Sequence, residues 1–115
     1  MTIENLTIAE ARELHNLFGA GTESNIAVQT AFQIGENYLI RTVSMTNTGK
    51  VVSVSEHEVV LEQAAWVADT GRFSAAIESC VFSEVEPFPD GKQVIVGRSA
   101  IIDAVQINTL PRNLK

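Results

Sequence analysis

Apolar and polar residues alternate with a period of two through the middle of the chain, from Tyr38 to Val67. β-branched residues dominate this stretch, which is broken at Asn47-Thr48-Gly49 and again at Glu56-His57-Glu58. Asn and Gly tolerate the positive φ that a tight hairpin demands, so the first break is expected to be a turn. The pattern predicts three consecutive strands joined by two tight turns: Tyr38–Thr46, Lys50–Ser55 and a third that opens at Val59.

Two segments show helical spacing instead. Thr7 and Glu10 form a capping box, and the apolar residues that follow predict a helix over Ile8–Phe18, ended by Gly19. A second short helix is expected after the meander, with Asp69 or Thr70 as its N-cap. Its apolar stripe faces the core and consists of Phe73, Ala76, Ile77 and Cys80. Cys80 closes that stripe, which predicts a packed small hydrophobe rather than a nucleophile.

The stretch before the meander and the end of the meander itself are less regular. Gly21–Glu36 alternates with a period of two, which favours a strand paired outside the meander. An extended arm that packs two side chains on the core is the alternative. Ala64-Ala65-Trp66-Val67 is apolar on both faces, so Trp66 is expected to be largely buried where the third strand ends.

The C-terminal part of the chain predicts two further strands. Glu84–Gly91 is expected to be a loop because it contains two prolines and Asp-Gly. Gln93–Val96 and Ala100–Ile107 then predict two strands around a Gly97-Arg98-Ser99 turn. Both faces of these strands are apolar, whereas a small barrel has one interior, and no Lys or Pro blunts their edges. The sequence therefore predicts an oligomer interface at Val94, Ile95, Val96, Ile101, Ile102, Val105 and Ile107.

The length of 115 residues fits one domain, residues 1–115. Its parts are an N-terminal helix and arm (1–37), the meander (38–67), an inserted helix and loop (68–91) and two C-terminal strands (92–108). The single Cys80 cannot form an intrachain disulfide, which favours a reducing compartment. The acidic N-terminus is unlike a signal peptide, and no apolar run approaches the ~20 residues of a membrane span. We expect a cytoplasmic protein, or a virion component if the protein is phage-encoded.

Charge is unevenly distributed along the chain, whose net charge is −6. Between Glu56 and Asp90 there are eight acids against Arg72 alone; after Asp90 there are four bases against Asp103 alone. This −7 middle and +3 tail favour head-to-tail contact between copies, although ordinary solubilising charge is an equal alternative. The eight dispersed bases form no phosphate track, which argues against nucleic-acid binding.

The order of these elements, and two short motifs, resemble the Sm-like family of small β-barrels. Gly49-Lys-Val-Val-Ser-Val-Ser-Glu-His-Glu-Val-Val-Leu61-Glu62 is similar to the first Sm motif, and Val94-Ile-Val-Gly97-Arg98-Ser-Ala-Ile101 to the second. The resemblance implies a mainly β fold with two short helices. The implied fold is a five-stranded Sm-like or SH3-like barrel with an N-terminal helix and a helix inserted between strands 3 and 4. It also implies pairing of the last two strands between neighbouring subunits.

The chain departs from that family where its RNA-binding members hold a base. The position of the base-binding Asn carries Glu58, and the usual Arg-Gly order is inverted to Gly97-Arg98. Other phrases, such as Ala-Ala-Trp-Val-Ala-Asp-Thr-Gly-Arg-Phe, look similar to small uncharacterised bacterial or phage proteins. The resemblance therefore carries over the barrel and its assembly, but not the base-binding site.

Candidate chemistry is sparse. His15 and His57 lie on different elements without metal-ligand spacing, and no serine or cysteine has a nucleophile motif around it. We expect no catalytic residue, no metal and no cofactor. The sequence favours a non-enzymatic, self-assembling structural protein that forms rings, tubes or filaments. The alternative is an RNA-binding Sm-like regulatory module.

Overall fold

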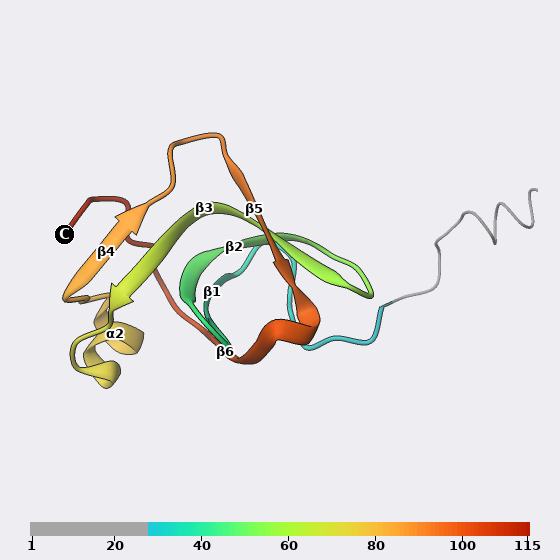
Figure 1. The fold of residues 1–115 in the computed structure, drawn as a ribbon, viewed down its shortest axis with the longest axis horizontal. Coiled ribbons are helices and arrows are strands. Elements are labelled where there is room, and N and C mark those ends of the chain that lie inside the picture. The colour runs from blue at the N-terminus through green and yellow to red at the C-terminus, as the bar shows by residue number, and fades with distance from the viewer. Residues whose placement is uncertain (1–27) are drawn as a thin grey trace, which may run out of the picture.

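A computed structural model describes residues 28–115. The predicted helix Ile8–Phe18 and residues 21–27 of the predicted strand lie outside the described residues. Within them the chain is mainly β, with six antiparallel strands, one α-helix and one 3-10 helix (Figure 1). In chain order these are β1 Asn37–Thr42, β2 Thr46–Val54, β3 Glu58–Asp69, α2 Phe73–Ser79, β4 Glu84–Pro87, β5 Gln93–Gly97, the 3-10 helix Arg98–Ala100 and β6 Ile101–Gln106.

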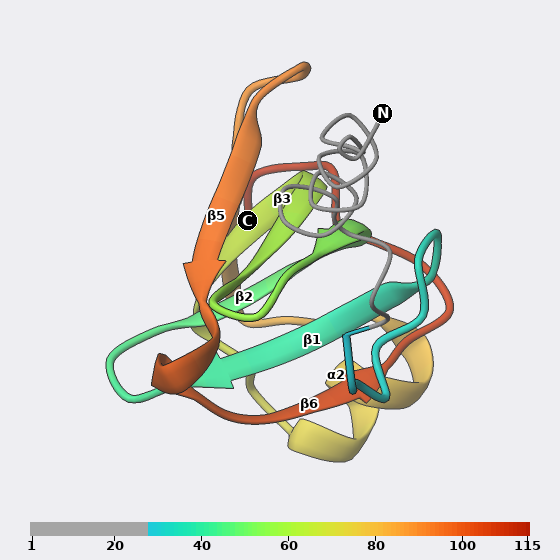
Figure 2. The same cartoon turned by 90° about the vertical axis from the view of Figure 1, so that its right-hand side faces the viewer.

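The strands form one open sheet in the order β4-β3-β2-β1-β6, with β5 also paired to β3. The long strand β3 therefore has two partners along one side: Glu58–Glu62 pairs with β5, and residues 65–69 pair with β4. The last two strands do not pair with each other; β5 lies against β3, and β6 lies against β1. Figure 2 shows β5 and β6 diverging from the 3-10 helix that joins them.

The change of partner along β3 coincides with a β-bulge. The pairing between β2 and β3 shifts between Thr48 and Lys50, and Gln63 on β3 takes a left-handed φ of 53°. Such a bulge bends the strand and increases its twist, which directs the second half of β3 away from β5 and toward β4. The short strand β4 lies in a segment predicted as a loop. That prediction is wrong for Glu84–Pro87, and the sheet has six strands rather than five.

The predicted position of the first hairpin turn is also wrong. Asn47, Thr48 and Gly49 lie inside β2, and the chain reverses earlier, at residues 43–45. The Thr42 hydroxyl stabilises this turn by accepting the backbone N–H of Met45 at 2.9 Å, while the Thr42 N–H donates to the Met45 carbonyl at 2.8 Å. The second predicted turn is confirmed, because β2 ends at Val54 and β3 begins at Glu58.

The inserted helix is confirmed as α2, although its N-cap is Arg72 rather than Asp69 or Thr70. The Asp69 carboxylate instead accepts the N–H of Gly71, whose φ is +68°, so it shapes the approach to the helix. Ala76 is fully buried, and Ile77 and Cys80 pack against the core as the apolar stripe predicted. The prediction is wrong for Phe73, the first residue of the stripe, which is 39% exposed. α2 lies near the ends of β3 and β4 (Figure 1).

Two hydrophobic clusters lie on the two faces of the sheet, because successive side chains of a strand alternate between faces. The first cluster consists of Tyr38, Ile40, Val51, Val59, Leu61, Ala64 and Val96. The second lies on the face that α2 covers and consists of Leu39, Ala65, Val67, Ala76, Phe82, Val85 and Ile107.

The described part of the Gly21–Glu36 segment contains no strand, so the strand interpretation is wrong for residues 28–36. It forms an irregular arm whose end is bonded to β2. The Gly35 N–H donates to the Val51 carbonyl at 2.7 Å, and Phe32 packs edge-on against Tyr38 with ring centroids 5.1 Å apart. The alternative interpretation, an arm that packs on the core, is the one that fits these residues.

Candidate functional site

The seven residues predicted to form an oligomer interface do not share one surface. Val96 and Ile107 are buried in the two core clusters. Val94 and Ile101 pack partly against the first cluster, and Val105 packs partly against the second. Ile95 on β5 and Ile102 on β6 remain, with 63% and 65% of their surface exposed. Of the seven predicted residues, these two face outward.

Ile95 and Ile102 lie on two strands that are each paired along one side within the described residues. β5 pairs with β3 and β6 pairs with β1, so each leaves a row of backbone N–H and C=O groups without a strand partner among residues 28–115. The edge of β4 differs, because the chain's own C-terminus covers it. Val85 and Lys115 exchange two backbone hydrogen bonds, at 3.0 and 2.9 Å.

The carboxylate on β6 is held by a neighbouring strand. Arg41 on β1 donates to both oxygens of Asp103, at 2.8 Å from Nε and 2.6 Å from Nη2. Hydrogen bonding from the Arg41 guanidinium lowers the pKa of the Asp103 carboxyl below its ordinary value. The guanidinium also lies 5.1 Å from the ring centroid of Phe73, at the start of α2. The charge of Asp103 is therefore engaged within the chain.

Two basic residues of the C-terminal part, Arg98 and Arg112, are also engaged within the chain. Arg112 binds the carbonyls of Ala64 and Phe88 and the carboxylate of Asp90. Arg98 donates to the carbonyl of Ser55 at 2.8 Å. Two of the four bases assigned to the basic tail thus hold the fold together, so they contribute less to any attraction between copies.

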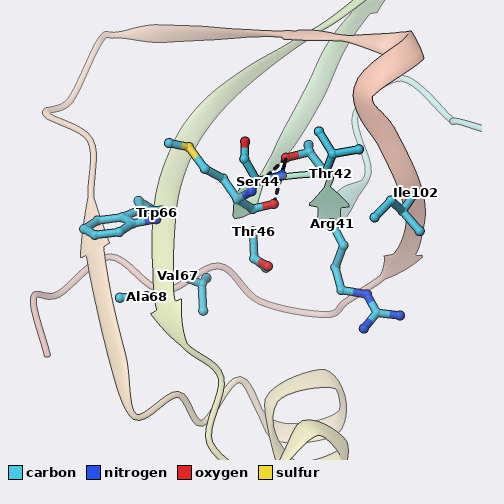
Figure 3. Close-up of a pocket in the computed structure, with 10 residues that line it drawn as sticks. Arg41, Thr42, Ser44, Thr46, Trp66, Val67, Ala68 and Ile102 are labelled. Atoms are coloured by element: carbon cyan, nitrogen blue, oxygen red, sulfur yellow. Dashed lines mark hydrogen bonds between the residues drawn. The ribbon is translucent and has the colours of Figure 1, made fainter.

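The prediction that Trp66 is largely buried is wrong, because 42% of its surface is exposed. β5 pairs with β3 only as far as Glu62. The face of the sheet that carries the first core cluster is therefore open where Trp66 projects from it. Four surface hollows meet at this residue, the largest of about 550 Å³. Figure 3 shows Trp66 and Ile102 on opposite sides of that largest hollow, with the turn after β1 between them.

The side chains around Trp66 come from segments far apart in the sequence. Met45 belongs to the first hairpin turn, and Pro87, Phe88 and Pro89 belong to the end of β4 and the loop after it. This surface was missed in the sequence because Met45 was expected in a strand, Trp66 in the core and residues 87–89 in a loop. The exposure of Met45, at half of its surface, follows from the earlier position of the hairpin turn.

Among residues 28–115, no three His, Cys, Asp or Glu side chains are grouped so that they could hold a metal ion. His57 lies in the exposed turn before β3 and contacts Glu56 at 3.9 Å. None of the helices in this part of the chain is long and apolar enough to cross a membrane. Comparison of the chain with protein-family models, with curated proteins and with solved structures gives no match.

Proposed function

We propose that this protein is a non-enzymatic structural protein that assembles with copies of itself through β5 and β6. The observation that carries the proposal is the pair of one-sided strands, each with an isoleucine more than 60% exposed. A copy that adds its β6 to the β5 of a neighbour satisfies the backbone groups of both strands and covers Ile95 and Ile102 together.

Pairing of β5 with β6 is head-to-tail, because the two strands lie on different edges of the sheet. Head-to-tail contacts form closed rings when the rotation between copies closes, and tubes or filaments when it does not. The backbone hydrogen bonds between Lys115 and Val85 support this choice of edges, because they occupy the edge of β4. Among residues 28–115, β5 and β6 are then the strands available for pairing with another copy.

We further propose that the strands curl into a five-stranded Sm-like barrel to which β4 and α2 are additions, with a second helix over Ile8–Phe18. Support comes from the order β6-β1-β2-β3-β5 and from the 3-10 helix between the last two strands. Nucleic-acid binding is the less favoured function of such a barrel here. Arg98 is bound to backbone carbonyls, and Glu58 is exposed at the position of the base-binding residue.

Light scattering of the purified protein at micromolar concentration tests the assembly, and negative-stain microscopy then distinguishes rings from filaments. We expect a mass of several chains for the wild type; a mass near one 12.5 kDa chain refutes the proposal. Ile95→Lys places a charge on the β5 edge and should release monomers. Ile34→Lys is the matched control, because Ile34 is 61% exposed but lies in the arm. It should leave the wild-type mass unchanged.

Mixing variants tests the head-to-tail geometry. Ile95→Lys blocks β5 and leaves β6 competent, whereas Ile102→Lys blocks β6 and leaves β5 competent. Each variant alone should be monomeric, and an equimolar mixture should form dimers and nothing larger. If either variant alone forms dimers, the contact joins like edges and the head-to-tail arrangement is wrong.

A further inference from the structure

The backbone groups on the free edge of β5 can be assigned residue by residue. Along an antiparallel ladder, residues that exchange backbone hydrogen bonds with the partner strand alternate with residues that do not. The Arg98 N–H donates to the His57 carbonyl at 2.9 Å, one step beyond the end of the β3–β5 ladder. Every second residue from Arg98 therefore bonds to β3. The residues between them direct their N–H and C=O groups to the edge that has no strand partner among residues 28–115: Gln93, Ile95 and Gly97.

The free edge of β6 follows from the same alternation. The Ile107 N–H donates to the Asn37 carbonyl at 2.9 Å, one step beyond the end of the β1–β6 ladder. Ala104 and Gln106 therefore direct their backbone groups away from β1. Nearer the start of β6 the register with β1 shifts, which leaves Ile102 without a partner on that strand. Such a bulge re-aims a side chain, and Ile102 is accordingly 65% exposed.

We propose that a second copy adds its β6 to β5 in one antiparallel register, with Ile95 opposite Ala104 of the joining copy. This register rests on the proposed self-assembly through β5 and β6, and it specifies which residues meet. Every strand pair within residues 28–115 is antiparallel, so a joining strand of this direction continues the same sheet. Ile95 then exchanges backbone hydrogen bonds with Ala104, and Gln93 exchanges them with Gln106.

The lengths of the strands and the sizes of their side chains select this register. A shift of one residue would set outward-directed backbone groups against inward-directed ones. All five residues of β5 have a partner on β6 in the proposed register, whereas a shift of two residues shortens the ladder to four pairs or to three. Ile95 lies opposite Ala104, and Gly97 lies opposite Ile102, so each isoleucine faces a small residue. The two isoleucines are then diagonal neighbours on one face, where each covers part of the other.

The other face of the joined strands fits this register as well. Val94 lies opposite Val105 of the joining copy, and both are half-buried, so their apolar side chains meet. Val96 lies opposite Asp103, the one charged residue of β6. Arg41 of the joining copy holds that carboxylate through two hydrogen bonds, so no unpaired charge is brought into the contact.

Cysteine cross-linking measures the register. Cys80→Ser removes the native thiol, and each protein then carries one cysteine on β5 or on β6. Opposite residues of an antiparallel pair have Cα atoms about 5.5 Å apart, which suits a disulfide, whereas cysteines two residues out of register lie beyond its reach of about 7 Å. A mixture of Ile95→Cys and Ala104→Cys proteins should form a disulfide-linked dimer under mild oxidation. Mixtures of Ile95→Cys with Ile102→Cys or with Gln106→Cys should cross-link at least about fivefold more slowly.

This experiment separates failure of the register from failure of the assembly. If Ile95→Cys cross-links faster with Ile102→Cys or Gln106→Cys than with Ala104→Cys, the register is wrong although β5 and β6 do pair. If no mixture cross-links while the wild type has a mass of several chains, the copies join elsewhere, and both the register and the pairing of β5 with β6 are wrong. A wild-type mass of one chain overturns the assembly and the register with it.

Paired charges provide a second test that needs no oxidation. Ile95→Lys should release monomers, and Ala104→Glu in the same chain places a carboxylate directly opposite the new ammonium group of the neighbouring copy. The double variant should regain a mass of several chains, because opposite charges directly across a strand pair stabilise it. Gln106→Glu adds the same charge two residues away, so it should restore less of the mass when combined with Ile95→Lys. Equal restoration by the two acids would reflect net charge alone and would overturn the register.

Discussion

Replacing Gly49 by alanine tests the packing of β2 against β3. A Cβ added at Gly49 would lie 2.9 Å from the Cβ and 3.1 Å from the Cδ1 of Leu61. Leu61 is fully buried in the first core cluster, so it has little room to move aside. Gly49 has no positive φ, which means that glycine is needed here for the close approach and not for a turn.

The size of the effect follows from two opposing terms. Forcing an extra carbon into a well-packed core costs about 1–3 kcal/mol. Replacing glycine by alanine inside a strand recovers about 0.5–1 kcal/mol of conformational entropy. The free energy of unfolding should therefore fall by roughly 0.5–2 kcal/mol. At about 4–8 °C per kcal/mol for a small domain, the thermal midpoint should fall by several degrees.

Urea and thermal unfolding followed by circular dichroism measure this change. Gly97→Ala is the matched control, because nothing lies within 4 Å of its added Cβ and its φ is −68°. That variant should be neutral or slightly stabilising. Gly49→Asn separates packing from turn geometry: a larger side chain is worse than alanine if the cause is Leu61, and better if the site needs a left-handed turn. A Gly49→Ala protein as stable as the wild type would refute the packing explanation.

Three further predictions concern side chains outside the core. Arg112→Ala should lower the free energy of unfolding in urea by about 1–3 kcal/mol, because it removes the charged hydrogen bonds to the carbonyls of Ala64 and Phe88, whereas Lys92→Ala should have no effect. Asp103 has a lowered pKa, so its contribution to stability is present above the ordinary carboxyl pKa and is lost as the pH falls through the lowered one. Asp103→Asn should therefore flatten the loss of stability below about pH 4 in urea titrations, and an unchanged pH profile would contradict this. Acrylamide should quench Trp66 efficiently in the native protein, since the residue is 42% exposed; a quenching constant near zero would place the indole in the core.

The elements that the sequence predicted well are those whose signal is periodic over many residues. The alternation between Tyr38 and Val67 indicated consecutive strands, and the stripe from Phe73 to Cys80 indicated α2. The first turn was misplaced because Asn-Thr-Gly is a strong local turn signal. Two facts outweigh it: the Thr42 hydroxyl stabilises an earlier reversal through a local hydrogen bond, and Gly49 is required beside Leu61, which is distant in the sequence.

Two other errors have one physical cause, the change of partner along β3. Trp66 follows two buried alanines, so its burial was a reasonable expectation. The bulge at Gln63 ends the cover that β5 provides, and no local pattern reveals where a strand changes partner. The same change creates a place for β4. Glu84–Pro87 contains one buried apolar residue, Val85, and a terminal proline, which resembles a loop as much as a short strand.

The outer strands show why both faces of a strand can be apolar without forming an interface. Val96 belongs to the first core cluster and Ile107 to the second, so neighbouring elements of the same chain cover them. A period of two predicts which residues share a face, but not which face remains uncovered.

Ile95 and Ile102 are the apolar residues that this internal cover does not reach, and they lie on the strands whose outer edges have no cover within residues 28–115. Natural proteins usually protect such edges with charge, and β6 does carry one carboxylate, Asp103. Arg41 holds that carboxylate through two hydrogen bonds, which neutralises the charge that would repel an added strand. In the proposed assembly, a copy that joins at β6 does so through its own β5 and brings a further free β6 edge, so growth would continue until the twist accumulated between copies closes a ring or generates a filament.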